Sequence, residues 1–272
     1  MKLLSISMPH HDASMSYWDG EQLRYIKLER SRQEKRASFE ALSDWKNEAE
    51  SVWNIDLQDI DDVVFSFDPT ALPPALQGQL TPETFARLVR DQAKAERLTK
   101  PICDYLGVKQ GWIASHHYSH ALSTWMLETS PPDVRIVIDG LGDGRPWSVY
   151  RKDRLVAAGN INNGSIGWGI RDAGKVLGIS YGHFNDIAGK VMGLQSYGKV
   201  DAAYLRHLGR HSFEQIREVW SAENWYAHKK DALLGKLSHL DWVATVHAAM
   251  GEMLVEFFQR FANSGETISY SG

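Results

Sequence analysis

The chain has 272 residues, of which 43% are apolar, and a formal net charge of −4. These values predict a globular protein of one large or two ordinary domains. The net charge is slightly negative and both signs are interspersed along the chain, which argues against a nucleic-acid partner. The single cysteine, Cys103, excludes an internal disulfide and a thiolate zinc cluster. The short N-terminal apolar run, broken by Pro9, predicts neither a signal peptide nor a membrane span, so we expect a cytoplasmic protein.

The first part of the chain predicts a strand meander followed by helices. Residues 2–8, 14–18 and 22–28 have strand composition, and Asp19-Gly20 is a hairpin signal between the last two. Residues 31–50 are charged with apolar residues at helical spacing, which predicts one solvated helix with Ser31 as a candidate N-cap. Residues 61–68 predict a buried strand, and Thr81-Pro82-Glu83 predicts the start of another helix.

The second part predicts the same order of elements. An apolar strand over 134–144 ends in a glycine- and aspartate-rich turn, and 146–152 and 155–162 predict two further strands. The apolar stripe over 241–265 predicts a long core helix that ends at Asn263-Ser264-Gly265. Residues 267–272 predict a strand that runs into a glycine turn, so we expect the second lobe to be truncated at this point.

Two histidine-rich stretches are candidate chemical sites. His10-His11-Asp12-Ala13-Ser14 follows the first strand, and its polar groups could hold a phosphate or form an ordinary polar hairpin. Ser115-His116-His117-Tyr118-Ser119-His120 precedes an apolar helical segment. On a helix, His116 and His120 share a face and both rings can reach one Zn, Fe, Cu or Ni ion, with a third ligand from elsewhere. A pair of surface histidines is the alternative.

Two glycine-rich stretches complete the set. In Asp139-Gly140-Leu141-Gly142-Asp143-Gly144 the glycines allow close approach of a phosphate, and Asp139 or Asp143 could orient a hydrated Mg²⁺. A tight hairpin is the alternative, and neither the P-loop nor the Rossmann pattern fits. In Gly189-Lys190-Val191-Met192-Gly193 the lysine could neutralise an anionic ligand or be a solvated lysine at a helix start.

Five motifs, in order along the chain, resemble those of the O-carbamoyltransferases, the family of nodulation protein U and the cephalosporin and tobramycin carbamoyltransferases. They are HHDAS, HHYSHA, VIDGLGDG, GKVMGLQSYG and SYSG. The resemblance implies an α/β, duplicated actin-like ATPase (ribonuclease H-like) fold, with mixed sheets flanked by helices. We place its first lobe at 1–130 and its second at 131–272. It also implies a YrdC-like domain, absent from this sequence, that makes carbamoyladenylate from ATP and carbamoyl phosphate.

The resemblance also assigns roles to residues. His11, beside Asp12, matches the general base on a small-molecule acceptor hydroxyl, and His116 and His120 match a metal pair that holds Fe²⁺ or another divalent transition metal. The nucleotide-binding positions are Ser14, Asp139, Gly140, Gly142, Gly189, Lys190, Ser271 and Gly272. The family's third metal ligand is an aspartate that lies beyond the end of this sequence.

The implied activity is carbamoyl transfer to an acceptor hydroxyl by way of carbamoyladenylate. Gly144-Arg145 and LQSYG depart from the commoner family residues, the first of them at positions that bear on acceptor choice. A sugar kinase or a threonylcarbamoyl transferase on the same fold is the main alternative, and a non-catalytic nucleotide-binding fragment is a third interpretation.

Overall fold

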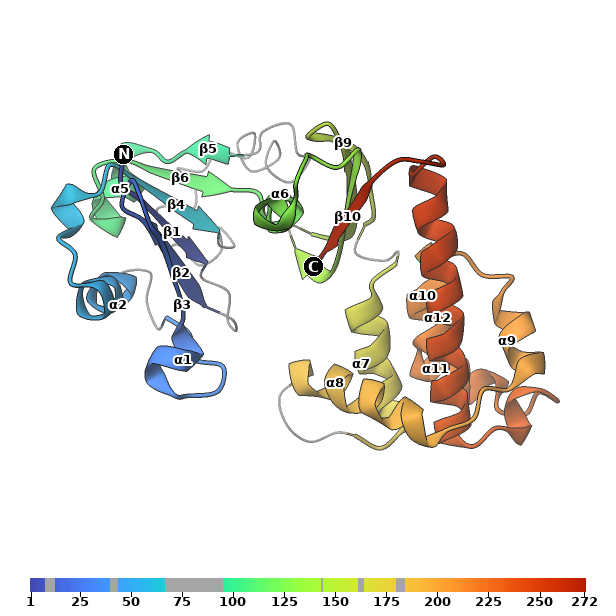
Figure 1. The fold of residues 1–272 in the computed structure, drawn as a ribbon. Coiled ribbons are helices and arrows are strands. Elements are labelled where there is room, and N and C mark those ends of the chain that lie inside the picture. The colour runs from blue at the N-terminus through green and yellow to red at the C-terminus, as the bar shows by residue number, and fades with distance from the viewer. Residues whose placement is uncertain (8–12, 40–43, 67–94, 143, 161–163, 180–183) are drawn as a thin grey trace. The chain divides into compact units, whose positions relative to one another are not determined.

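The computed structural model describes residues 1–7, 13–39, 44–66, 95–142, 144–160, 164–179 and 184–272 (Figure 1). They form two compact units, Met1–Ser119 and His120–Gly272. The division falls inside helix α6 (His116–Leu122), before the lobe boundary that we predicted after residue 130. Among the helices within these ranges, none combines the length and the apolar character needed to cross a membrane.

The first unit is built on a six-stranded mixed sheet. Its strands are β1 (Leu3–Ser7), β2 (Ser14–Trp18), β3 (Leu23–Lys27), β4 (Asp62–Ser66), β5 (Ala95–Arg97) and β6 (Gly111–Ala114). Their order is β3-β2-β1-β4-β6-β5, in which β1–β2 and β2–β3 are antiparallel and β4 is parallel to both β1 and β6. Burial alternates along β1, β2 and β4, as expected of strands that place every second side chain in the core. The predicted meander is therefore confirmed.

Helices pack on this sheet and complete the core of the first unit. They are α1 (Leu28–Arg32), α2 (Asp44–Trp53), η1 (Leu57–Asp59), α5 (Lys100–Leu106) and the start of α6. Trp45 of α2 contacts Phe65 of β4 edge to face, with ring centroids 5.8 Å apart. Cys103 is buried in the same core, and burial raises the pKa of its thiol. The helix start predicted at Thr81 lies outside the described residues.

The single helix predicted over 31–50 is wrong. α1 ends at Arg32, and Gln33 and Arg36 adopt left-handed backbone conformations with φ of 52° and 64°. Ser31 is not a cap but lies inside α1, where its hydroxyl donates to Glu48 of α2 at 2.5 Å. The physical reason is tertiary: helical spacing continues through the segment, but this contact, with the Arg32–Glu48 ion pair, turns α2 back against α1.

The second unit repeats the strand pattern of the first. Its strands are β7 (Val134–Gly142), β8 (Arg145–Arg151), β9 (Arg154–Ala158) and β10 (Ile268–Ser271). In the order β9-β8-β7-β10 the first two pairings are antiparallel and the last is parallel, as in β3-β2-β1-β4. Two successive units with one strand order and the same pairing directions confirm the predicted duplicated ribonuclease H-like fold.

A bulge interrupts β7 near its end. Pairing with β8 is regular as far as Ile138↔Trp147 and resumes at Gly142↔Arg145. Three residues of β7, 139–141, therefore lie opposite Pro146 alone. Proline has no N–H with which to continue the ladder, so the partner strand cannot hold the intervening residues in regular register. Such bulges are common beside functional sites, and Asp139 is the first residue of this one.

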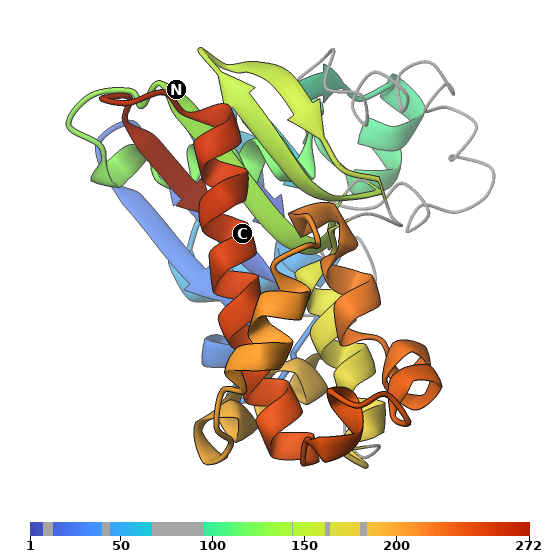
Figure 2. The same ribbon diagram turned by 90° about the vertical axis from the view of Figure 1, so that its right-hand side faces the viewer.

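The helices of the second unit enclose its larger core. They are α7 (Ile166–Val176), α8 (Phe184–Leu194), α9 (Ala202–Leu208), α10 (Ile216–Trp220), α11 (Ala222–His228) and α12 (His239–Phe261), with η3 (Trp125–Leu127), η4 (Gln195–Tyr197), η5 (Phe213–Gln215) and η6 (Leu234–Lys236). Figure 2 shows α12, in red, alongside the other helices. Phe257 of α12 packs on Trp147 of β8 at 4.9 Å. The predicted core stripe is confirmed, although the helix ends at Phe261, before Asn263-Ser264-Gly265.

Candidate metal and nucleotide site

Helix α6 carries the histidine-rich stretch, as predicted. Ser115, which is buried, accepts a hydrogen bond from the backbone N–H of Tyr118 at 3.3 Å, an N-cap contact that favours a helix start at His116. His116 and His120 are then one turn apart and half-buried, whereas His117 is fully buried. The sequence therefore presents two imidazoles on one helix face and uses the third in packing.

One face of β7 lies against α6. Side chains alternate along a strand, so Arg135, Val137 and Asp139 begin on the same side, opposite Ile136 and Ile138 of the helix-covered core. This side of β7 faces α6, because the guanidinium of Arg135 donates to the carbonyl of Ala121 in α6 at 3.0 Å. The alternation therefore carries Asp139 toward the same helix.

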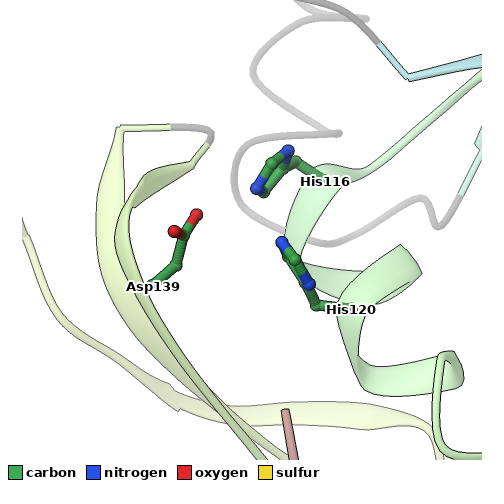
Figure 3. Close-up of side chains that lie close together, drawn as sticks. All are labelled: His116, His120 and Asp139. Atoms are coloured by element: carbon green, nitrogen blue, oxygen red, sulfur yellow. The ribbon is translucent and has the colours of Figure 1, made fainter. Parts of the chain in front are cut away.

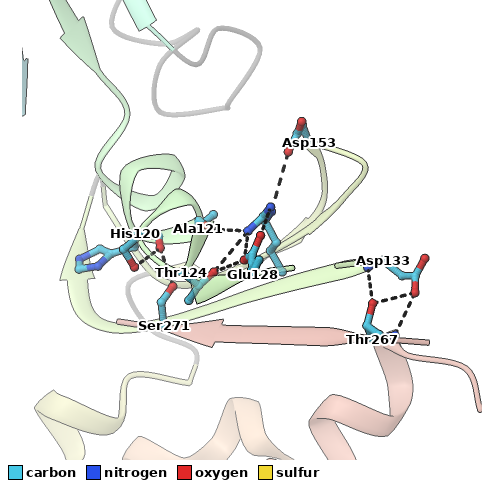
Figure 4. Close-up of polar contacts among 10 residues, drawn as sticks. His120, Ala121, Thr124, Glu128, Asp133, Asp153, Thr267 and Ser271 are labelled. Atoms are coloured by element: carbon cyan, nitrogen blue, oxygen red, sulfur yellow. Dashed lines mark hydrogen bonds and ion pairs between the residues drawn. The ribbon is translucent and has the colours of Figure 1, made fainter. Parts of the chain in front are cut away.

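A buried ion pair fixes the segment that follows α6 to β7 (Figure 4). Arg135 donates to both carboxylate oxygens of Glu128, at 2.6 and 2.9 Å, and also to the hydroxyl of Thr124 at 3.3 Å. The two charged side chains are 7% and 10% exposed. The guanidinium, assisted by Thr124, holds the pKa of Glu128 below its ordinary value. Four hydrogen bonds from one side chain thus join the end of α6 and the η3 segment to the second sheet.

The carbonyl of His120 is held as well. It accepts hydrogen bonds from the hydroxyls of Ser123 and Ser271, each at 2.7 Å (Figure 4). Ser271 is the last residue of β10, and its Cα partner in β7 is Val137. Since the last carbonyls of a helix have no partner within the helix, these contacts satisfy one of them and fix the residue that carries the second imidazole.

Figure 3 shows His116, His120 and Asp139 facing one another. One potential ligand atom from each residue lies within 4.8 Å of the other two, and all three side chains are half-buried. The cluster is carried by one helix and by the β7 bulge, both fixed by the contacts above. Within the described ranges, this is the group of histidine and carboxylate side chains spaced to hold a metal ion. Two imidazole nitrogens and a carboxylate oxygen form a donor set that suits non-haem iron, zinc and related ions.

The N-terminus of α7 lies next to this cluster. The hydroxyl of Ser165, the N-cap, donates to the carbonyl of Gly140 at 2.6 Å and accepts from Trp168 N–H at 3.3 Å. A Cβ on Gly167 would lie 3.0 Å from the Cα of Gly140, so the first turn of the helix touches the bulge. Helix N-termini carry partial positive charge and attract anions. A Cβ on Gly140 would meet no atom of the described residues within 4 Å, so these residues leave space beside Asp139.

The other predicted site residues fall in several places. His11 and Asp12 lie outside the described residues. Ser14 begins β2 and pairs with Ser7 in the first unit. Gly189 and Lys190 lie in the middle of α8 and are exposed, rather than in a loop or at a helix start.

The glycines of the predicted nucleotide segments in the second sheet lie at a bulge and at a strand end. Gly142 closes the β7 bulge opposite Arg145. Gly272 has a φ of 126°, and a Cβ there would lie 2.0 Å from the carbonyl oxygen of Ile138. Gly140, Ser271 and Gly272 are therefore brought close to the cluster by β7 and β10.

Three residues of this site were missed by sequence reasoning or given another role. Asp139 was assigned to nucleotide binding, whereas the structure groups it with the two histidines. The alternation of Arg135, Val137 and Asp139 along β7 would have placed them on one face, but it could not show that α6 lies there. The Glu128–Arg135 pair crosses a turn and has no fixed sequence spacing by which to recognise it.

The fold and this cluster define an α/β protein of the duplicated ribonuclease H-like class. No family model and no curated protein sequence matches the chain. Among solved structures it is similar to YeaZ from Pseudomonas aeruginosa, with 14% identity over 60% of this chain and 70% of that one and a TM-score of 0.31. It is also similar to the Aquifex aeolicus PPX-GPPA enzyme, with 13% identity over 100% and 96% of the two chains and a TM-score of 0.35. At these TM-scores the likenesses add nothing to the strand order, on which the fold assignment rests.

Proposed function

We propose that the chain is the transfer region of an ATP-dependent O-carbamoyltransferase, which moves a carbamoyl group from carbamoyladenylate to a hydroxyl of a small acceptor. The observation that carries the proposal is the His116–His120–Asp139 cluster beside the N-terminus of α7. The order of the five sequence motifs supports it. A YrdC-like domain or protein would supply carbamoyladenylate from ATP and carbamoyl phosphate.

The donor set fits a divalent transition metal, with Fe²⁺ as the proposed ion. Two neutral imidazoles and one carboxylate on fixed elements match the ligand preference of non-haem iron. A metal ion bound there would neutralise phosphate charge and polarise an adjacent carbonyl. Asp139 accepts a hydrogen bond from the N–H of Gly140 at 2.5 Å, a contact that helps orient its carboxylate toward the imidazoles.

The remaining roles belong to other groups of the protein. The N-terminus of α7 would bind the nucleotide phosphate through backbone N–H groups, and the open face of Gly140 would admit it closely. His11 would accept the proton of the acceptor hydroxyl as its oxygen bonds to the carbamoyl carbon. The bond from that carbon to the adenylate phosphate oxygen breaks, and AMP leaves with the electron pair.

Metal analysis tests the observation on which the proposal rests. We expect about one transition-metal ion per chain after reconstitution, and loss of most of it in His116→Ala, His120→Ala and Asp139→Asn. His207 and His211 provide a matched control, since they have the same spacing, their ring centroids are 6.0 Å apart, and they are not part of the three-residue cluster. Metal content that falls equally in His207→Ala, or that stays unchanged in all variants, would contradict the metal site.

A transfer assay tests the reaction. With carbamoyladenylate supplied by a YrdC-like protein, AMP release should require a hydroxyl acceptor, and the acceptor should gain the mass of a carbamoyl group. A gain of phosphoryl mass from ATP would instead identify a sugar kinase on the same fold. ATP binding without turnover of any acceptor would favour a non-catalytic nucleotide-binding fragment. Reconstituted metal with no carbamoyl product would retain the metal site and reject the transferase.

A further inference from the structure

The hydroxyl of Ser165 joins the β7 bulge to the first turn of α7. It donates to the carbonyl of Gly140 at 2.6 Å and accepts from the N–H of Trp168 at 3.3 Å, so one oxygen serves as both donor and acceptor. Ser165 is only 1% exposed, and it makes both contacts away from bulk solvent. All three residues belong to the second unit. The hydroxyl therefore links two elements of one compact body.

The strand that faces the bulge cannot supply such a donor at its central position. Residues 139–141 of β7 lie opposite Pro146, which has no N–H. Gly140 is also the residue whose own N–H donates to the carboxylate of Asp139 at 2.5 Å. The hydrogen bonds thus form a chain that runs from this carboxylate through Gly140 and Ser165 to the backbone of α7. The position of Gly140 helps to decide where the carboxylate points.

The backbone that carries the hydroxyl is fixed on both sides of Ser165. Gly164 has a φ of 81°, and a Cβ there would lie 2.7 Å from Nε1 of Trp147, so glycine is needed for this close approach. On the helix side, a Cβ on Gly167 would lie 3.0 Å from the Cα of Gly140. The first turn of α7 therefore packs directly on the bulge, and the hydroxyl has little freedom to move away from its acceptor.

We propose that Ser165 is a positioning residue for the metal site: by holding the carbonyl of Gly140 against α7, it directs the carboxylate of Asp139 into the metal cluster. The inference rests on the proposed function, which makes this cluster a metal centre. Residues that orient a metal ligand affect metal affinity without touching the metal. Ser165 also caps α7, so the test must separate positioning from helix stability.

Two substitutions at Ser165 make this separation. Ser165→Ala removes the cap and the donor to Gly140, whereas Ser165→Gly removes the donor but keeps most of the capping stability, because glycine is itself a favourable N-cap residue. A positioning role predicts that both variants bind Co²⁺ about tenfold more weakly than the parent, although Ser165→Ala has the lower melting temperature. A role in helix stability alone predicts weaker Co²⁺ binding in Ser165→Ala only.

Ser221→Ala is the matched control. The hydroxyl of Ser221 caps α11 in the same way, because it accepts from the N–H of Asn224 at 3.0 Å. The loss of this cap should lower the melting temperature about as much as Ser165→Ala does and leave the affinity for Co²⁺ unchanged.

Two spectroscopic measurements complete the test. The absorption bands of bound Co²⁺ depend on its coordination geometry, so at saturating metal the spectrum of Ser165→Gly should resemble that of Asp139→Asn. In the metal-free protein, the NMR signal of the Gly140 amide should shift in both Ser165 variants and not in Ser221→Ala. A parent protein that binds no Co²⁺ would reject the metal site, and this role with it. Parent-like affinity or a parent-like spectrum in Ser165→Gly would overturn the positioning role alone.

Discussion

Replacing Arg135 by methionine should strongly destabilise the second unit. The substitution leaves the carboxylate of Glu128, which is 10% exposed, without its bidentate partner. Breaking a buried ion pair from one side costs about 3–5 kcal/mol, because the remaining charge is uncompensated. The carbonyl of Ala121 also loses its donor, which adds on the order of 1 kcal/mol. Urea denaturation followed by circular dichroism measures the change in the free energy of unfolding.

The double variant Arg135→Met, Glu128→Leu provides the control. With both charges removed, an apolar pair of similar volume should recover most of the loss, leaving on the order of 1 kcal/mol for the Ala121 carbonyl. The parent protein should also lose stability as the pH falls below the ordinary glutamate pKa of about 4.3, because the pKa of Glu128 is lowered in the folded state. The double variant has no Glu128 and should lack the part of the acid destabilisation that comes from this residue. Single and double variants that agree within about 0.5 kcal/mol would refute the reasoning.

Three further predictions concern capping, packing and acid stability. Ser115→Ala should cost about 1 kcal/mol and weaken metal binding by α6, measured by thermal melts and metal titration. Ser51→Ala, whose hydroxyl donates to the carbonyl of Glu48 in its own helix, should not affect metal binding. Gly167→Ala should destabilise by about 1–3 kcal/mol through contact with Gly140. Gly251→Ala, whose added Cβ would meet no atom of the described part of the chain within 4 Å, should stabilise by about 0.5–1 kcal/mol. Hydrogen bonding to Arg151 lowers the pKa of Glu266 to about 2, so its contribution to stability is complete above about pH 4.5 and is lost as the pH falls toward 2. Arg151→Met should move the acid transition to higher pH, and an unchanged acid transition would contradict this assignment.

The sequence predicted the parts of the fold that depend on local periodicity. Strand composition identified both meanders, and their common order is the observed duplication. The stripe from Val243 to Phe257 identified α12, because burial of one helical face leaves a regular pattern. Segment 31–50 has a similar pattern but was assigned wrongly, since the contacts of Glu48 with Ser31 and Arg32 operate between two helices and leave no local signal.

The candidate site was predictable only in part for the same reason. The spacing of His116 and His120 is local, and the structure places them on one helix as expected. Asp139 lies 19 residues after His120 in the sequence, and its position depends on strand β7 and on the bulge opposite Pro146. Neither the spacing nor the composition of the sequence predicts that Asp139 and the two histidines lie close together.

Through the backbone of His120, strand β10 is coupled to the candidate metal site. The residue presents its imidazole to Asp139 and its carbonyl to the hydroxyl of Ser271, on the strand that borders the second sheet as the described residues form it. An edge strand is anchored by hydrogen bonds along one side only, so it yields more readily to a neighbour than an interior strand does. A small shift of β10 would move the carbonyl of His120, which Ser271 binds, and would therefore tilt the imidazole of the same residue. No other residue lies between the two groups to absorb the displacement.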